Sequence, residues 1–464
     1  MRSRALLGRV SAGLAALALS AAAWSLPGHA QSLPESLANT YLTNPTLLAA
    51  RAELRAVNEG VPQALSAWRP SVSVEGDVGY ETSKLLGQNA SPSSGLTAGA
   101  RLVAEQTIWA GGSIRANVDS AEAVVYAQRA LLADTEQSVL LAAATAYMDV
   151  WQAQAILDLN IANEERLRRQ REATVDRFNV GEVTRTDVAQ ADARLAGATA
   201  DRVSSEGDLA TAQSIFYQII GLVPRRIEQA PPLQVLPRSM QETVAYAQQD
   251  APNLVAARFL ENSALSDIRA QLGALLPSVS LLGLLDYSRD NTVQDGVPNL
   301  DFFAASIVLQ VSIPLYQQGL VASQVRQAKQ IASQRRLEIT EALRQAEQDA
   351  VAAWEALETA RAQISSFESQ VRANTVALEG VEQESLVGAR TVLDVLDAEQ
   401  ELLQAQVSLV GAQRDEVVAG FQVATAIGRL TVANLDLGVA IYDPKIDYDK
   451  VRDAWFGLDA PGAE

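Results

Sequence analysis

Residues Ser113 to Asn179 read SIRANVDSAEAVVYAQRALLADTEQSVLLAAATAYMDVWQAQAILDLNIANEERLRRQREATVDRFN and include neither glycine nor proline. Alanine, leucine, glutamine, glutamate and arginine dominate this stretch, and all of them favour helix. As one helix it would be about 100 Å long, which exceeds what a globular domain needs. Apolar or small residues recur at spacings of three, four or seven along a first seam: Val118, Ala121, Val125, Leu132, Val139, Ala142, Ala146 and Ala153. A second seam includes Val124, Leu131, Leu141, Ala144, Tyr147, Trp151 and Leu157. A helix with two such seams has neighbours on two sides, as in the wall of a tube.

The first thirty residues have the pattern of a secretory signal peptide. Arginines follow Met1, an apolar run extends from Ala12 to Trp24, and Gly28-His29-Ala30 gives a small-residue cleavage pattern before Gln31. The apolar run is too short and too rich in alanine to be kept as a membrane span. We therefore expect residues 1–30 to be removed and the mature chain to be exported without a transmembrane helix.

Composition argues against several functional classes. The formal net charge is -18, which disfavours binding to nucleic acid or anionic lipid. The chain has no cysteine, and its one histidine, His29, lies in the predicted signal peptide. The mature chain thus lacks the residue types that most metal sites and nucleophile–base pairs use, so we expect no metal, no cofactor and no enzyme activity. An enzyme that uses carboxylates alone stays possible.

The mature sequence is an internal duplication with a constant offset of 207 residues. Prolines and glycines align at this offset as well as helix-forming residues, which chance similarity of alanine-rich helices does not explain. The aligned pairs include Pro70 and Pro277, Gly112 and Gly319, Gly181 and Gly388, Asp187 and Asp394, and Gly221 and Gly428. We assign the first repeat to residues 31–240, the second to 241–430, and a C-terminal equatorial segment and tail to 431–464.

Each repeat is expected to contain one β-hairpin. Strands are predicted at 70–82 and 96–109, and again at 277–289 and 302–314, because apolar and polar residues alternate strictly there. Loops rich in Gly, Pro, Ser and Asn separate them, at Leu86–Gly95 and Asn291–Asn299. Strands of this length can cross an outer membrane when tilted. A soluble, half-buried hairpin is the alternative interpretation.

Helices are expected to flank each hairpin. A short helix precedes the first strand of each repeat, roughly at Thr46–Trp68, where Gly60 and Pro62 should kink it, and at Asn253–Leu275. A long helix with a shorter return helix follows the second strand. The long helices are predicted at 113–179 and 320–386 and the return helices at 186–220 and 393–427. Four strands are too few to close a barrel, for which about eight are needed. Open sheet edges are not tolerated in lipid, so several chains must share one barrel, and three chains with twelve strands are the simplest solution.

These residues together resemble the TolC family of bacterial outer-membrane efflux proteins, over essentially the whole mature chain. The likeness rests on the Pro-Ser-Val entry to each first strand, the strand exits at 106–112 and 313–319, and the hairpin VGARTVLDVLDA at 387–398. The resemblance implies a homotrimer with a shared twelve-stranded β-barrel in the outer membrane of a Gram-negative bacterium and a long α-helical barrel in the periplasm. It further implies docking to a periplasmic adaptor protein and to an inner-membrane pump or ABC exporter.

The resemblance also assigns roles to residues at the helical tips. Asp394 and Asp397 match the family's acidic rings at the narrow periplasmic entrance, Arg390 matches a latching arginine, and Asp187 looks like its acidic partner. The tip turns that meet the adaptor match Val180-Gly181 and Val387-Gly388. The chain departs from the family at Ser385, where an aromatic residue is common, whereas Phe178 keeps an aromatic at the matching position of the first repeat.

The residues themselves permit a simpler interpretation of two of these aspartates. Thr184 to Asp187 and Thr391 to Asp394 both have the spacing of a capping box, which would explain each acid by helix capping alone. Asp397 is different, because its counterpart in the first repeat is Gln190. It is three residues from Asp394 and on the same helix face, so a trimer would place six carboxylates around one axis and raise their pKa values by repulsion. A solvated surface face is the alternative for Asp397.

The sequence thus predicts a passive trimeric exit duct of a tripartite efflux or type I secretion system, gated at its periplasmic tip. The alternative of another class is a non-conducting periplasmic coiled-coil tether or adhesin that its β-hairpins anchor in the membrane. The sequence leaves open the cargo, the inner-membrane pump, the resting state of the gate and the role of the predicted loops.

Overall fold

The computed structural model describes residues 31–83, 93–233, 236–290 and 300–459. The predicted signal peptide and most of the two predicted strand-connecting loops lie outside these ranges. The chain divides into two compact units, one made of Met1–Asn44, Leu140–Gln234 and Leu357–Phe421 and the other of Pro45–Val139, Val235–Ala356 and Gln422–Glu464. Two long helices, α4 (Ser113–Asn179) and α8 (Leu320–Leu386), contribute residues to both units.

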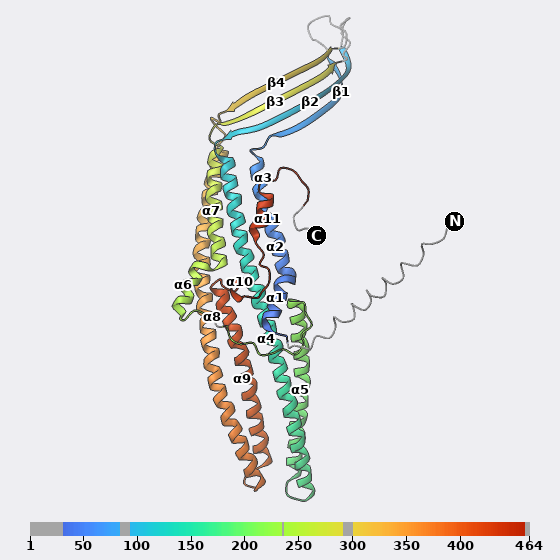
Figure 1. Cartoon of the computed structure of the whole chain (residues 1–464), viewed down its shortest axis with the longest axis vertical. Coiled ribbons are helices and arrows are strands. Elements are labelled where there is room, and N and C mark those ends of the chain that lie inside the picture. The colour runs from blue at the N-terminus through green and yellow to red at the C-terminus, as the bar shows by residue number, and fades with distance from the viewer. Residues whose placement is uncertain (1–30, 84–92, 234–235, 291–299, 460–464) are drawn as a thin grey trace, which may run out of the picture. The chain divides into compact units, whose positions relative to one another are not determined.

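The first unit consists of two antiparallel helical hairpins and a short N-terminal helix. The C-terminal part of α4 turns into α5 (Arg185–Ile220), the C-terminal part of α8 turns into α9 (Val392–Ala426), and α1 (Leu33–Thr43) lies at the N-terminus (Figure 1). Alanine and leucine seams hold the hairpins together, as the sequence spacing predicts. One cluster joins Leu167, Ala198, Val392 and Leu396, and a second joins Leu378, Val395 and Leu402.

An aromatic residue of α4 ties the N-terminal segment to this unit. Tyr147 is 1% exposed, and its hydroxyl donates to the carbonyl oxygens of Gln31 at 2.8 Å and Glu228 at 2.9 Å. Burial raises the pKa of Tyr147 to about 12. Tyr147 therefore has the packing role that a seam position predicts, and its hydroxyl finds buried partners.

The second unit joins a bundle of helices to one β-sheet. Its shorter helices are α2 (Pro45–Asn58), α3 (Gly60–Ser66), α6 (Met240–Asp250), α7 (Pro252–Gly273), α10 (Val432–Leu435) and α11 (Pro444–Val451). Its strands are β1 (Ser71–Ser83), β2 (Ser93–Ala110), β3 (Ser278–Asp290) and β4 (Leu300–Ser312). The sheet is antiparallel throughout, in the order β1-β2-β3-β4. Among the described residues, each of the two outer strands therefore has a partner strand on one side only.

The strand register gives the sheet one face that is apolar along all four strands. Val74 lies opposite Leu102, Leu102 opposite Leu285, and Leu285 opposite Ala305, so the alternating residues of all four strands share a surface. This surface is not covered within the chain. Among its members, Val74 is 73%, Val78 74% and Ile307 82% exposed.

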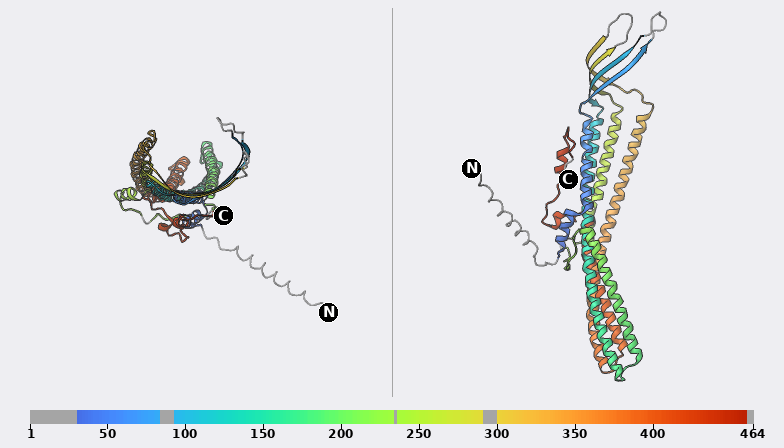
Figure 2. Two further views of the ribbon diagram at one scale, coloured as in Figure 1. Left: turned by 90° about the horizontal axis from the view of Figure 1, so that it is seen from above. Right: turned by 90° about the vertical axis from the view of Figure 1, so that its right-hand side faces the viewer.

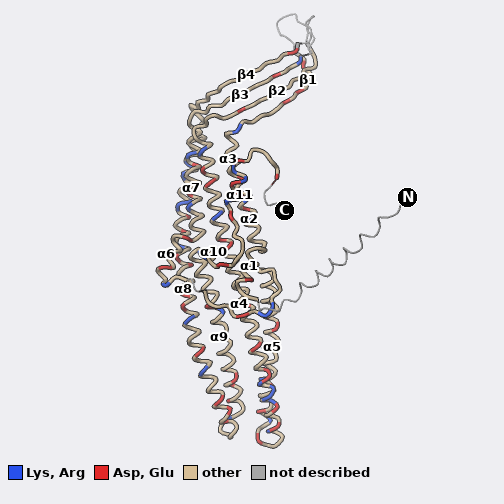
Figure 3. The backbone as a smooth tube through the Cα atoms, viewed as in Figure 1, with Lys and Arg blue, Asp and Glu red and all other residues tan. Residues whose placement is uncertain are grey.

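The other face of the sheet, called the polar face below, carries the charged residues of the strands together with some apolar ones, such as Leu282, Leu284 and Val308. Arg101 Nε donates to Asp286 Oδ2 at 2.8 Å across β2 and β3, beside a concavity lined by Glu75, Asp77 and Thr97. Asp77 on β1 pairs with Gly99 on β2, and its carboxylate lies over that glycine. A side chain at position 99 would clash with it, because a Cβ atom there would stand only 2.7 Å from Asp77 Oδ1. The sheet is curved when seen from above (Figure 2), and few charged residues lie along its strands (Figure 3).

Most element ends differ from the expected ones by one or two residues. The kink expected at Gly60 and Pro62 is present as a break between α2, which ends at Asn58, and α3, which begins at Gly60. Two expectations for β2 need correction. The strand β2 has 18 residues and begins at Ser93, so Gly95 belongs to a strand and not to a loop. It also carries a β-bulge between Thr107 and Trp109, where strict alternation had been expected.

None of the helices within the described ranges is long and apolar enough to cross a membrane.

Candidate functional site

The expected adaptor-contact residues form two tight turns of the same design. In the first, the amide of Gly181 donates to Phe178 O at 3.0 Å and that of Glu182 to Arg177 O at 2.9 Å. This bond pattern is the Schellman motif, which closes a helix end with a residue in the left-handed region. Gly181 has a φ of 84° and Gly388 a φ of 78°, which glycine adopts without strain.

Both turns expose apolar side chains. Val180 is 72% exposed in the first turn, and Leu386 and Val387 are 75% and 80% exposed in the second. The two turns differ at the position where the sequence departs from its family, since Phe178 is 41% exposed whereas Ser385 is buried. The second tip thus presents a flat aliphatic pair, and the first presents a valine beside a half-exposed ring.

The two aspartates that begin the return helices are capping residues, as their spacing predicts. In α9, Asp394 Oδ2 accepts from the backbone N–H of Thr391 at 2.9 Å and from its hydroxyl at 2.8 Å, and the amide of Asp394 donates to Thr391 Oγ1 at 3.3 Å. Asp187 and Thr184 form the same box at the start of α5, with distances of 2.8, 2.8 and 3.3 Å. The capping interpretation is confirmed for both residues.

Capping also sets the electrostatics of Asp394. The backbone and side-chain hydrogen bonds from Thr391, helped by the charge of Arg390, hold the pKa of Asp394 below its ordinary value. Within one chain this effect is opposite to the rise expected from a ring of six carboxylates. The cap therefore favours the ionised form of Asp394. Repulsion between subunits would have to outweigh the hydrogen bonds from Thr391 before Asp394 takes up a proton.

Arg390 has an acidic partner inside its own hairpin. Its Nε donates to Glu384 Oε2 at 2.9 Å, across the turn that joins α8 to α9. The first hairpin holds an equivalent pair with the charges exchanged, Arg177 Nε to Glu182 Oε2 at 3.2 Å, in which the arginine is on the helix and the acid in the turn. Sequence analysis did not identify Glu384, although opposite charges flank the glycine of both turns.

Asp397 is paired across the two hairpins of this unit. Arg194 on α5 donates to Asp397 Oδ1 on α9 at 2.5 Å, and about half of the Asp397 side chain stays exposed. Arg194 was not predicted, because nothing in its sequence spacing connects it to a residue two hundred positions away. Its position seven residues after Asp187, about two helical turns, places both on one face of α5.

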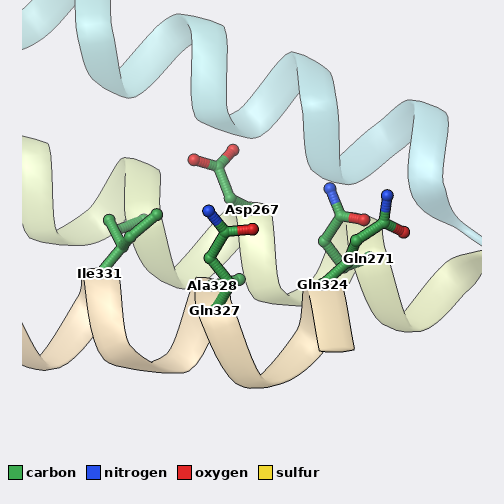
Figure 4. Close-up of a pocket in the computed structure, with 7 residues that line it drawn as sticks. Asp267, Gln271, Gln324, Gln327, Ala328 and Ile331 are labelled. Atoms are coloured by element: carbon green, nitrogen blue, oxygen red, sulfur yellow. The ribbon is translucent and has the colours of Figure 1, made fainter. Parts of the chain in front are cut away.

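A groove with polar walls lies between α7 and α8 (Figure 4), lined by Asp267, Gln271, Gln324, Gln327, Ala328 and Ile331 among others. Its one carboxylate, Asp267, already accepts from Ser120 Oγ at 2.7 Å. The groove therefore offers amides and a satisfied carboxylate, which is not a constellation for acid–base chemistry. Within the described ranges no group of three or more His, Cys, Asp or Glu residues is arranged to hold a metal ion.

The tip geometry and the sheet can be compared with known proteins. The family model described as "Outer membrane efflux protein" matches residues 37–222 and again 244–429. The chain belongs to the outer membrane efflux protein family. The two matched stretches are themselves 207 residues apart, the same offset that relates the repeats in the sequence.

Individual relatives of the chain support this family membership. The chain is 36% identical to outer membrane efflux protein BepC of Brucella suis over 93% of this chain and 92% of that protein. It is 30% identical to outer membrane protein TolC of Vibrio cholerae, over 91% and 94%. It is 24% identical to the alkaline protease secretion protein AprF of Pseudomonas aeruginosa, over 67% of each chain. The outer membrane is thus the location of this efflux-family chain, as predicted.

A solved structure supports the fold. The Campylobacter jejuni CmeC outer membrane channel superposes with a TM-score of 0.77 at 15% identity, over 93% of this chain and 94% of that one. The TolC-family resemblance drawn from the sequence is therefore confirmed, with the helical and antiparallel-strand content that it implies.

Proposed function

We propose that three copies of this chain form an exit duct through the outer membrane, with a shared twelve-stranded barrel and a helical barrel built from the long hairpins. The observation that carries the proposal is the four-stranded sheet, whose apolar face is exposed and whose outer strands β1 and β4 lack a second partner in the chain. Lipid does not tolerate unpaired strand edges, so such a sheet must be closed by other copies. Each 13-residue strand exceeds the roughly 9–11 residues that a tilted strand needs to span a bilayer.

The polar face of the sheet then lines the duct. Arg101, Asp286, Glu75 and Asp77 are on this face, and three copies repeat them around the pore. Charged residues are tolerated in a water-filled lumen and not toward lipid, which fixes the orientation of the sheet.

The helical tips form the gate in this proposal. Asp394 and Asp397 line the entrance, and Arg390 exchanges partners: it pairs with Asp187 when the entrance is closed and with Glu384 when it is open. The support is that Arg390 Nε already contacts Glu384 and that Asp187 is exposed, with its carboxylate used only by its own cap. Ion pairs at exposed sites are each worth about 1 kcal/mol or less, so partner contacts can open such a gate.

A periplasmic adaptor protein docks on the tips, at Val180-Gly181 and Val387-Gly388, and an inner-membrane pump or ABC exporter supplies the cargo. The exposed aliphatic residues at rigid turns support this docking, because small apolar knobs on a fixed backbone suit helix-tip packing. The relatives are named for both efflux and protease secretion, so a tripartite efflux system and a type I secretion system are both within this proposal.

Single-channel recording in planar bilayers tests the gate. We expect a small, cation-selective conductance for the wild type, reduced selectivity for Asp394→Asn and Asp397→Asn, and a larger conductance for Arg390→Ala. Glu384→Gln should lower the conductance, because Arg390 loses its open-state partner and stays with Asp187. If Glu384→Gln and Arg390→Ala both enlarge the conductance equally, Glu384 belongs to the latch and the exchange is wrong.

The same recordings distinguish the duct from the tether. Native mass spectrometry of the detergent-purified protein should give three chains per complex. A folded, membrane-inserted protein that conducts in none of these variants would favour the non-conducting tether.

A further inference from the structure

We infer that the C-terminal segment Trp455–Leu458 is a second membrane contact of the chain, which inserts its aromatic side chains into the phospholipid surface of the inner leaflet of the outer membrane. This inference rests on the proposed barrel, because the barrel sets the level of the bilayer. It adds a lipid-binding element that is separate from the strands and from the gate.

The segment exposes apolar side chains that nothing in its unit covers. Trp455 is 59%, Phe456 93% and Leu458 103% exposed. The Trp455 and Phe456 rings lie side by side, with centroids 6.5 Å apart. Gly457 between them and Leu458 has a φ of 123°, a conformation that other residues rarely adopt, so the backbone turns here and spreads the side chains.

A fixed anchor holds the segment at the base of the sheet. Arg69, two residues before β1, donates to the carbonyl oxygen of Ala454 at 2.6 Å, and its guanidinium lies 4.8 Å from the centre of the Trp455 ring. A cation over an indole face is an attractive arrangement that also fixes the ring orientation. The segment is therefore held beside the residues that lead into the membrane strand.

The preceding helix α11 fixes the path of the segment from the other side. Arg452 donates to Glu122 Oε1 on α4 at 3.2 Å, and the Tyr448 hydroxyl lies 3.3 Å from the same oxygen. Only Asp453 separates Arg452 from Ala454, whose carbonyl oxygen accepts from Arg69, so Trp455 has little freedom to leave the base of the sheet. Seen from above, the path to the C-terminus lies on the convex side of the curved sheet (Figure 2).

Other aromatic residues mark the same level. Trp68 precedes β1, Trp109 is the second-last residue of β2, and Tyr316 follows β4. Their exposed fractions are 43%, 51% and 84%. Since β1 begins and β2 and β4 end at the helical end of the sheet, these three residues and Trp455 belong to one end. Tryptophan and tyrosine concentrate at membrane–water boundaries, where the ring contacts acyl chains and the polar atom stays in the headgroup layer.

The occupant is a phospholipid surface rather than an anionic protein or a nucleic acid. Acids flank the segment at Asp453 and Asp459 and its neighbouring arginines already have partners, so charge attraction to an acidic partner is not available. An amphipathic aromatic group can bind without charge attraction, because it buries its apolar area at the boundary between lipid headgroups and acyl chains. The sequence has no cysteine that could carry a thioether-linked lipid, so the aromatic segment is a non-covalent anchor in addition to the barrel.

The cysteine-free sequence makes the test direct, because one introduced cysteine can be labelled uniquely. An environment-sensitive fluorophore is attached to Phe456→Cys in the full mature protein, reconstituted in phosphatidylcholine nanodiscs. We expect a blue-shifted emission, weak quenching by iodide in water, and strong quenching when the lipid is brominated near the headgroup end of its acyl chains. The same label in Phe456→Cys/Arg69→Gln should shift toward the red and lose most of the lipid quenching.

Two control labels separate this inference from the barrel. A label at Ile307→Cys, on the apolar face of the sheet, reports lipid contact of the barrel when the lipid is brominated near the methyl end of its acyl chains. A label at Val387→Cys reports the water-exposed tip. If the Ile307 label is quenched by brominated lipid but the Phe456 label is quenched only by iodide, the anchor is wrong while the barrel stands. If the Phe456 label is shielded from both quenchers, a second copy of the chain covers the segment and the lipid anchor is wrong. Loss of lipid quenching at Ile307 overturns the barrel, and with it the anchor.

Discussion

Glu399 is a carboxylate buried two residues after the exposed gate candidate Asp397. It is 5% exposed, and its Oε2 atom has no hydrogen-bond partner. Burial raises its pKa, opposed by the charges of Arg166 and Arg169 on α4 and reinforced by that of Glu382 on α8. Asp397 is thus exposed and Glu399 buried although they are two residues apart on α9, because positions two apart on a helix point to different faces.

The raised pKa of Glu399 predicts a pH-dependent stability. The folded state keeps the proton to a higher pH than the unfolded chain does, whose glutamate pKa is about 4.3. The ionised carboxylate therefore destabilises the fold above the folded pKa, and this penalty vanishes as the pH falls below the unfolded value. Glu399→Gln should raise the thermal midpoint near neutral pH and leave it unchanged in acid, as measured by circular dichroism at a series of pH values.

Glu401→Gln is the matched control for this change, because Glu401 is an exposed carboxylate on the same helix. It should leave the thermal midpoint almost unchanged at every pH. A lower midpoint for Glu399→Gln at neutral pH would mean that attraction to Arg166 and Arg169 outweighs burial, which would contradict the expected sign.

At the scale of elements, the repeats show what a sequence determines and what it leaves open. The long helices end where predicted because a local feature, Gly181 or Gly388 in the left-handed region, stops each of them. The capping boxes were predictable for the same reason, since Thr and Asp three positions apart need only their own helix.

Contacts between elements could not be read in this way. The pairing of Arg194 with Asp397 depends on how α5 and α9 pack, and that of Arg390 with Glu384 depends on the turn path. The bulge at Ile108 was missed because one unpaired residue leaves the apolar count of a strand almost unchanged. The predicted gate residues were therefore located by resemblance and local spacing, whereas their partners within the chain required the structure.

The capping box of α9 gives a prediction at this scale. Thr391→Ala removes the hydroxyl contacts with Asp394 and should destabilise the first turn of α9 by about 1 kcal/mol. Hydrogen exchange should then be faster for the amides of the first turn, about fivefold at that energy, while the rest of α9 is unaffected. Thr375→Ala is the control, because its hydroxyl bonds only to Val371 O within α8. Equal acceleration in both variants would contradict a local cap.

At the scale of the whole molecule, the sheet cannot be stable alone in either solvent. Its apolar face would be exposed to water, and its outer strand edges would be unpaired in lipid. Both problems are removed together when other copies close the sheet into a barrel, because closure pairs the edges and turns the apolar face outward. In the proposed barrel the polar face, on which Arg101 and Asp286 form their cross-strand pair, would meet water inside.

Two neighbouring residues of β4 test this assembly. Ile307 is on the apolar face opposite Gly283, and Ser306 is on the polar face opposite Leu284. Arginine at Ile307 would enter the bilayer near its middle, at a cost of roughly 2–4 kcal/mol for each chain and three chains in the barrel, whereas arginine at Ser306 would meet water in the lumen. We expect Ile307→Arg to abolish most of the heat-modifiable, outer-membrane form on gel electrophoresis, and Ser306→Arg to retain it with reduced cation selectivity in planar bilayers. If both variants assemble equally well, or if Ser306→Arg is the one that fails, the faces are assigned wrongly and the barrel must be rejected in this orientation.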